Sequence, residues 1–574
     1  MAVATVPDEQ QQVEEDAQLE GLDLSLMSEA LKKACDDNPH LLEYVAGLPA
    51  SVGMPEYAAE LTRKMGENKQ PNIIYATNRS GVFIHILFDP DDVRNRYIPI
   101  EPISTMDIQA LLAKVETGLL DLKQRLPTID PDGDREKQLL ECLFMVTSED
   151  GRHDQGIVAR SKTFLSSRAQ PAVKLTPRES EAMKYLFVRD KLGLGVMDPL
   201  IIDPYIEDIS CSGMGNVFVE HKIFKALKST IVFSSFEELD RFVLWLSERV
   251  RKPVNYRKPI ADATLPDGSR INIVYGKDIS KRGSNFSIRK FNEVPLSIFE
   301  IADFGTLNYQ MLAYLSLAIG NGMNVFVSGE TASGKTTLLN AVTTFIPPLA
   351  KVLTIEDTAE LQVPHKNWIR EVVQSTKAEA GGAVTMFDLL RAALRQRPNE
   401  IMVGEIRGAE GNIAFQAMQT GHSVMATFHA ASVEKLIQRL TGDPILVPKN
   451  YVDNLNIVIL TSQVKLPSGK TGRRVTSIAE IVSYDASLQA FSFVEAFKWN
   501  QEKDIFEFTG YMTSYVLEYK IAPKLGIPNH KRQQIYAELD RRTAILKKLH
   551  EEKKVNGFYE VLDVLTRAQK EGLF

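Results

Sequence analysis

The sequence predicts an α/β fold for the C-terminal half of this 574-residue chain, preceded by α+β domains. Strand and helix signals alternate from about Asn308 to Thr461, the pattern of an open sheet covered by helices. The mostly apolar run Met323–Val327 leads into a glycine-rich turn, and the turn leads into a helical pattern. Three further strand-like runs end in polar motifs, and open α/β sheets bind their ligands at such strand ends.

The glycine-rich turn, Gly329-Glu-Thr-Ala-Ser-Gly-Lys335-Thr336, fits the phosphate-binding P-loop in motif and in flanking context. Glycines let backbone N–H groups curl around phosphate oxygens, and the following helix directs its positive end at the same charge. We expect Lys335 to reach the β- and γ-phosphates of ATP and the Thr336 hydroxyl to complete a Mg²⁺ shell. The predicted fold of this half is therefore a RecA-like P-loop NTPase domain. Its predicted nucleotide-binding residues are Gly329, Glu330, Thr331, Ala332, Ser333, Gly334, Lys335, Thr336 and Thr337.

The chain is too long for one core, and its N-terminal part divides by pattern. Residues 1–23 are predicted to be a disordered acidic tail, because the first 31 residues contain eight acids and no Lys or Arg. Such a tail either solubilises the chain or docks a basic partner. Residues 24–150 are predicted to form an α+β accessory domain, with a strand pair joined across Asn78–Gly81 and a helix over Leu111–Leu126. The polar stretch 151–175 is predicted to be a linker.

A second α+β domain is predicted over residues 176–298. It opens with a capping box, Thr176-Pro-Arg-Glu179, and contains the amphipathic helix Phe236–Val250 among short strands. The RecA-like domain is expected over residues 299–574. It includes a β-hairpin around Pro467–Lys470 and a helical end from about His530.

Composition excludes several other classes of protein. The net charge is −7, which does not favour nucleic acid as a partner. Cys35, Cys142 and Cys211 are widely spaced, so neither disulfides nor a zinc site are expected, and a reducing cytoplasm is the simplest location. No run approaches the ~20 apolar residues of a transmembrane helix, and no signal peptide is evident, so any membrane role is expected to be peripheral.

The polar motifs at the strand ends supply candidate catalytic groups. The run Lys351–Ile355 ends in Glu356, Asp357 and Glu360, one of which could activate the attacking water. Helix capping is the alternative role for these acids. The run Ile401–Val403 ends at Glu405, placed as a Walker B carboxylate that polarises water or holds Mg²⁺ through its shell. The third, Ser423–Thr427, leads to His429, either a γ-phosphate sensor or a structural histidine.

These motifs together resemble the type II/IV secretion ATPase superfamily, hexameric motors of pilus assembly, secretion and the archaellum. The resemblance lies in the P-loop, the acidic box Thr354–Leu361, the segment Leu394–Gly408 and the histidine box Thr420–Ala430, and it extends back over Asp198–Lys290. It implies that the catalytic residues are Glu405, Glu356 or a neighbour, His429, Arg407 of the Walker B box, and Arg270 and Arg289 as phosphate contacts across domains or subunits. A surface salt bridge is the alternative for each of these two arginines.

Two departures narrow the resemblance. The zinc-bearing members of the superfamily have cysteines after the histidine box, whereas here no cysteine follows Cys211. The acidic box reads Glu356-Asp357-Thr358, which is similar to that of the archaeal, tight-adherence and conjugation motors. The long N-terminal extension favours the archaeal arm. The resemblance thus implies a cytoplasmic homohexameric ATPase, peripheral to the membrane and partnered by a polytopic platform protein, which powers a pilus-like filament, archaellum or secretion system. The alternatives are a conjugation or type IV secretion motor and a nucleic-acid translocase.

Overall fold

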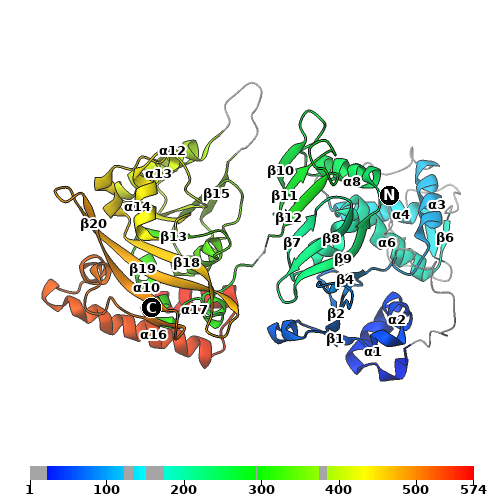
Figure 1. The fold of residues 1–574 in the computed structure, drawn as a ribbon, viewed down its shortest axis with the longest axis horizontal. Coiled ribbons are helices and arrows are strands. Elements are labelled where there is room, and N and C mark those ends of the chain that lie inside the picture. Colours follow the sequence, from blue (N-terminus) through cyan, green and yellow to red (C-terminus); the bar gives the residue numbers. More distant parts are fainter. Residues whose placement is uncertain (1–21, 122–132, 150–172, 292–293, 374–383) are drawn as a thin grey trace, which may run out of the picture. The chain divides into compact units, whose positions relative to one another are not determined.

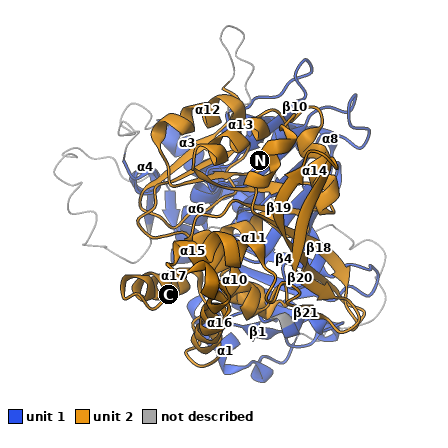
Figure 2. Cartoon of the chain, turned by 90° about the vertical axis from the view of Figure 1, so that its left-hand side faces the viewer, with its two compact units in different colours: residues 1–291 blue, residues 292–574 orange. Residues whose placement is uncertain are grey.

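The computed structural model describes residues 22–121, 133–149, 173–291, 294–373 and 384–574. The chain divides into two compact units, residues 1–291 and 292–574, coloured separately in Figure 2. Nearly all of the predicted acidic tail and most of the predicted linker lie outside the described residues.

A ten-stranded sheet organises unit 1, with strand order β1-β2-β3-β4-β9-β8-β7-β12-β11-β10 (Figure 1). β1 runs parallel to β2 and β4 runs parallel to β9, whereas the other neighbours are antiparallel. The strands are β1 (Glu56–Ala58), β2 (Asn72–Ala76), β3 (Phe83–Leu87), β4 (Arg96–Ile100), β7 (Ile206–Cys211), β8 (Gly215–His221), β9 (Lys225–Phe233), β10 (Ile260–Thr264), β11 (Arg270–Val274) and β12 (Asn285–Arg289).

The β4/β9 pair joins parts of the chain that are far apart in sequence. Arg96 pairs with Lys228 and Tyr97 pairs with Ser229. Strands from residues 24–150 and from residues 176–298 therefore lie in one continuous sheet. The short strands β5 (Thr147–Glu149) and β6 (Val173–Leu175) form a separate parallel pair.

One helix of unit 1 begins at a cap that the sequence predicts. The predicted capping box is confirmed at α6, where the Thr176 hydroxyl and backbone N–H both bond Glu179 Oε2, at 2.9 and 2.8 Å. The predicted hairpin of β2 and β3 is also confirmed. The α-helices are α1 (Glu29–Asp37), α2 (Pro39–Ala46), α3 (Ile108–Asp121), α4 (Arg135–Val146), α6 (Pro177–Lys191), α7 (Asp198–Ile202) and α8 (Phe236–Arg249), and the 3₁₀ turns are Leu24–Leu26, Ala50–Val52, Arg63–Glu67 and Gly195–Met197.

A buried polar cluster ties the two parts of this sheet together. The Asp203 carboxylate, fully buried after α7, accepts hydrogen bonds from the Tyr75 and Tyr97 hydroxyls, both at 2.7 Å. It also accepts one from the Tyr205 backbone at 2.8 Å, and Tyr75 lies 3.2 Å from His221 Nε2. Burial acts to raise the pKa of Asp203, and the hydrogen bonds oppose that rise. We call these residues the Asp203 cluster.

Unit 2 contains the predicted open α/β sheet, and this prediction of fold class is confirmed. Its strand order is β15-β14-β16-β17-β13-β18-β19-β20-β21. In this order, each strand from β15 through β18 runs parallel to the next one up to β18. The pairs β18/β19, β19/β20 and β20/β21 are antiparallel. The strands are β13 (Val325–Gly329), β14 (Val352–Glu356), β15 (Trp368–Val372), β16 (Glu400–Val403), β17 (Ser423–Phe428), β18 (Ile457–Lys465), β19 (Thr471–Asp485), β20 (Ala490–Asn500) and β21 (Ile505–Glu507).

Helices cover both faces of this sheet, as Figure 1 shows. Alternation along β13 sends Val325 and Val327 into the core beneath α10 and α16, whereas Phe326 enters the core beneath α12 and α13. The helices are α9 (Ile298–Asp303), α10 (Tyr309–Gly320), α11 (Lys335–Val342), α12 (Met386–Gln396), α13 (Glu410–Gln419), α14 (Val433–Thr441), α15 (Ala522–Lys524), α16 (Ile535–Glu551) and α17 (Phe558–Lys570), with a π-helix at Val516–Ile521 and 3₁₀ turns at Thr343–Phe345, Lys449–Asn454 and Asn529–Gln534. Within the described residues, no helix combines the length and the apolar character needed to span a membrane.

Candidate functional site: the phosphate loop and the strand ends around it

The phosphate loop connects β13 to α11, as predicted. Gly334 caps the helix with φ 91°, a left-handed conformation that favours glycine. At Gly329, a Cβ would lie 2.2 Å from the Thr461 carbonyl oxygen of β18, so a side chain there would collide with backbone. Both glycines are therefore needed for the loop to close against its neighbours.

Lys335, the first residue of α11, folds back over the loop. Its Nζ donates to the carbonyl oxygens of Gly329 and Glu330, at 3.0 and 2.8 Å. Burial lowers the pKa of the ammonium group, and the nearby Glu405 carboxylate opposes that effect. A cation held only by carbonyl dipoles at a helix N-terminus is well placed to exchange them for phosphate oxygens.

The strand ends predicted to carry chemistry meet beside this loop, because β14, β16 and β17 are consecutive neighbours on one side of β13. A Cβ on Gly404, just after β16, would lie 3.2 Å from Glu356 Cγ at the end of β14. The Ile406 backbone N–H bonds the Thr427 carbonyl at 3.1 Å. The ends of β14, β16 and β17 are thus in direct contact with their neighbours.

Glu405 and Arg407 form a charge pair at the end of β16. Arg407 Nη2 donates to Glu405 Oε2 at 2.6 Å, and the Arg407 side chain is two-thirds exposed. Burial acts to raise the pKa of Glu405, but the bond to Arg407 and the charge of Lys335 outweigh it and hold the pKa below its usual value. Glu405 is therefore an ionised carboxylate close to the phosphate-loop lysine.

The acidic box divides into a buried and an accessible part. Glu356 is 1% exposed, and its Oε1 accepts the backbone N–H groups of Glu360 and Leu361 at 2.7 and 2.6 Å. Burial raises the pKa of Glu356 to about 7. Asp357 is exposed and Glu360 is half-buried, and both raise the pKa of Arg407 through their charge. Glu356 thus holds the backbone of the box while its neighbours face the charged surface.

His429 reaches the phosphate loop directly. Its Nε2 lies 3.0 Å from the Thr331 hydroxyl. The next residue, Ala430, is bonded to Ser328 of β13 in both directions, through its N–H at 3.1 Å and its carbonyl at 2.7 Å. The Arg439 guanidinium of α14 also donates to the His429 carbonyl. The sequence-predicted histidine is therefore held against the loop by contacts on both sides.

The donors expected for Mg²⁺ are hard oxygen atoms. Thr336 is the second residue of α11 and half-buried, and Glu405 is ionised. Hydroxyl, carboxylate and phosphate oxygens with water are the ligands that Mg²⁺ prefers, so the residues present fit that ion. Of the other loop residues, Ser333 is buried with its hydroxyl 3.0 Å from that of Thr461, Ala332 adopts φ 61°, and Glu330 is exposed and Thr337 half-buried.

Arg270 and Arg289 lie in unit 1, whereas the phosphate loop lies in unit 2. They face each other across the antiparallel pair β11/β12, so both occupy one face of that sheet. Arg289 Nε is 3.9 Å from Asp208 Oδ1, and both side chains are more than half exposed. Their role as phosphate contacts stays a prediction.

Sequence reasoning missed a further arginine at the site. Arg473 of β19 donates from Nε to the Ala332 carbonyl of the phosphate loop at 3.0 Å. The hairpin of β18 and β19 is confirmed, and its turn lies at the carboxyl end of β18. Because β18 is parallel to β13, that hairpin brings the start of β19 to the phosphate loop. The predicted hairpin was therefore the one feature of the sequence that could have pointed to Arg473.

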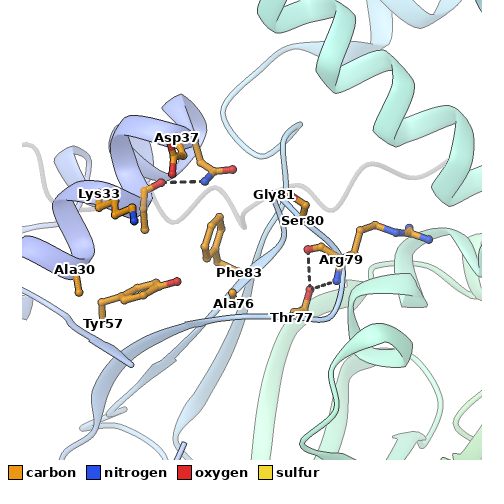
Figure 3. A pocket seen from close by; sticks show the side chains of 12 residues that line it. Ala30, Lys33, Asp37, Tyr57, Ala76, Thr77, Arg79, Ser80, Gly81 and Phe83 are labelled. Atoms are coloured by element: carbon orange, nitrogen blue, oxygen red, sulfur yellow. Dashed lines mark hydrogen bonds between the residues drawn. The ribbon is translucent and has the colours of Figure 1, made fainter. Parts of the chain in front are cut away.

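A separate pocket of about 330 Å³ lies in unit 1 between α1, β1 and the β2–β3 turn (Figure 3). Phe83 and Tyr57 form its apolar wall, and Lys33 and Asp37 stand at its edge on α1. Arg79 points away from the pocket and pairs with Asp198 of α7. Its guanidinium therefore joins the turn to α7.

Comparison with known proteins identifies the family of this chain. Residues 191–462 match the family model described as type II/IV secretion system protein. The uncharacterized protein MJ0900 of Methanocaldococcus jannaschii is 40% identical over 554 residues, which cover 96% of this chain and 98% of that protein. Protein VirB11 of Agrobacterium fabrum is 27% identical over 256 residues, covering 40% and 74%. The crystal structure of the VirB11 ATPase from the Brucella suis type IV secretion system aligns with TM-score 0.26 and 24% identity, covering 51% and 93%. The chain belongs to the type II/IV secretion ATPase superfamily.

Proposed function

We propose that this protein binds and hydrolyses ATP with Mg²⁺. One observation supports this most directly: Lys335, ionised Glu405 and His429 converge on one phosphate loop from three strand ends. Phosphoryl transfer requires little more than positioning and charge neutralisation, and these groups supply both.

Each side chain has a distinct role in this proposal. Lys335 leaves the loop carbonyls and neutralises the β- and γ-phosphates. Thr336 would hold Mg²⁺ directly and Glu405 would hold it through water, and the ion would supply further neutralisation of the phosphate charge. Glu405 polarises the attacking water, with Arg407 keeping its carboxylate ionised. His429 senses the γ-phosphate through its contact with Thr331. Glu356 positions the acidic box, whose accessible acids, Asp357 and Glu360, face Arg407.

The work done with ATP is the finer part of the proposal. We infer a cytoplasmic homohexamer, peripheral to the membrane, that acts with a polytopic platform protein to assemble a type IV pilus-like filament, an archaellum or a secretion system. The near full-length likeness to a protein of Methanocaldococcus jannaschii supports the archaeal arm. Arg270 and Arg289 complete the site when domains close or subunits assemble.

A type IV secretion motor is the second candidate, supported by the likeness of 40% of this chain to Agrobacterium VirB11. A nucleic-acid translocase is the third, because it would use the same RecA-like core, although the net charge of −7 favours no nucleic acid.

ATPase assays with and without DNA or RNA test the proposal. We expect that nucleic acid does not stimulate turnover. We also expect turnover to rise more steeply than linearly with protein concentration, because a neighbouring subunit can supply its arginines to the site only in the oligomer. Arg270→Ala and Arg289→Ala should then lower turnover, with Arg257→Ala, an exposed arginine of unit 1, as the matched control. Turnover proportional to concentration down to a demonstrated monomer would contradict the hexamer, and stimulation by nucleic acid would favour the translocase.

A further inference from the structure

Arg473 and Arg474 are adjacent in sequence but have opposite surroundings. Arg474 is buried, donates to both carboxylate oxygens of Asp504 at 2.7 Å, and bonds the Phe304 carbonyl at 3.0 Å. Arg473 is exposed, and within the part of the chain that the structure describes its side chain makes one hydrogen bond, from Nε to the Ala332 carbonyl. Arg474 is thus a structural anchor of β19, whereas the charge of Arg473 has no carboxylate partner in the described chain.

The contact of Arg473 with the loop uses a small part of its capacity. A guanidinium carries five N–H groups in a rigid plane, and only the Nε–H is engaged by Ala332. The Cδ of Arg473 also lies 3.3 Å from the position of a Cβ on Gly334, so the side chain crosses the loop next to the N-terminus of α11. Its terminal nitrogens are left for an anion bound at that helix end.

The sheet order separates Arg473 from the groups assigned to the γ-phosphate. Glu405 and His429 follow β16 and β17, on one side of β13, whereas Arg473 reaches the loop from β19, across β18 on the other side. The groups that act on the γ-phosphate therefore lie on the β16/β17 side. Arg473 reaches the loop from the opposite side.

We propose that Arg473 binds the α- and β-phosphates of the nucleotide and so strengthens the binding of ATP and ADP alike. This inference rests on the proposed function, because it takes the loop to hold a nucleoside polyphosphate. Arg473 is then a binding residue in the same unit as the loop, distinct from Arg270 and Arg289 of unit 1. Since both nucleotides share the α- and β-phosphates, Arg473 does not discriminate between them.

Affinity and turnover measured separately on the full chain test this role. The variants are Arg473→Ala and Arg473→Gln, because Gln keeps an N–H donor for the Ala332 carbonyl but removes the charge. Lys465→Ala is the matched control, since Lys465 is an exposed cation of the same hairpin. Fluorescent ATP and ADP analogues report binding, steady-state assays report KM and kcat, and thermal unfolding reports folding.

We expect both Arg473 variants to lower the affinity for ATP and for ADP by the same factor, roughly tenfold, as for a lost charge-assisted contact. The value of kcat should change by less than about twofold. The control should keep wild-type affinity and all variants should keep the wild-type melting temperature. A loss of affinity confined to ATP would overturn the proposal and place Arg473 at the γ-phosphate. Full recovery in Arg473→Gln would overturn it in favour of a loop-holding hydrogen bond, and unchanged affinity in both variants would also overturn it. If the wild type binds both nucleotides without hydrolysing ATP, the proposed function fails while the binding comparison still decides the role of Arg473.

Discussion

The two units use polar side chains in opposite ways. In unit 1, the Asp203 carboxylate is fully buried and is bonded to two tyrosine hydroxyls and a backbone N–H. In unit 2, Lys335 and Glu405 are half-buried at strand ends, and Lys335 is held by carbonyl oxygens of its own loop. A buried polar group whose hydrogen bonds are satisfied stabilises the fold. Charged groups at the end of a parallel sheet, whose partners can be exchanged, are available to bind a ligand. The difference predicts that changes in the first set reduce stability and that changes in the second reduce activity.

The largest expected effect is that of Lys335→Ala. It removes the cation directed at the β- and γ-phosphates, so ATP turnover should fall by about a thousandfold or more, and nucleotide binding should weaken. Phosphate-release assays and nucleotide titration measure both quantities. Lys366→Ala, an exposed lysine of unit 2, is the control. Unchanged turnover would show that the catalytic site does not lie at this loop.

Glu405→Gln comes next and separates binding from chemistry. The variant should bind MgATP with near wild-type affinity but hydrolyse it roughly a hundredfold more slowly, because it loses the charge that polarises water. Glu434→Gln, on the exposed side of α14, should behave as wild type. Lost ATP binding with intact hydrolysis per bound nucleotide would contradict the assigned role.

In unit 1, Asp203→Ala should lower the free energy of unfolding by about 3 kcal/mol, because the buried Tyr75 and Tyr97 hydroxyls lose their acceptor. Asp278→Ala, an exposed carboxylate of the same unit, should change it by less than about 0.5 kcal/mol. Chemical denaturation measures both. Below its melting temperature the Asp203 variant should bind nucleotide as the wild type does. A variant that stays stable but loses nucleotide affinity would break the contrast between the units.

The smallest effect concerns pH. His85 is fully buried between the Tyr44 hydroxyl and Asn72 Oδ1, at 2.8 and 2.7 Å, and burial lowers its pKa to about 4. Its charged form is therefore disfavoured in the folded state, so stability is fully present above the unfolded pKa of about 6.5 and is lost as pH falls towards 4. Between pH 7 and 5 the wild type should lose about 2 kcal/mol relative to His85→Gln. Parallel stability curves for the two proteins would show that this histidine does not titrate as its burial requires.

The sequence was a good guide to the strand ends and a poor one to what reaches them from elsewhere. The phosphate loop, Glu405 and His429 belong to local motifs, so their positions followed from the chain itself. Arg473 reaches the loop through a strand pairing between distant segments, and no local pattern records that contact. The same holds for β9 (Lys225–Phe233), whose pairing with β4 joins segments that are far apart in the sequence.

That β4/β9 pairing limits how the chain can be shortened. Without residues 22–100, β9 would become an edge strand, because the backbone groups that bond β4 would face solvent. Asp203 would at the same time lose both tyrosine donors and keep only part of the hydrogen bonding that offsets its burial. An exposed edge strand next to a buried carboxyl group that has lost two donors favours self-association over folding. The N-terminal segment is therefore an integral part of unit 1, and a truncated chain that begins near residue 173 should aggregate unless another strand covers β9.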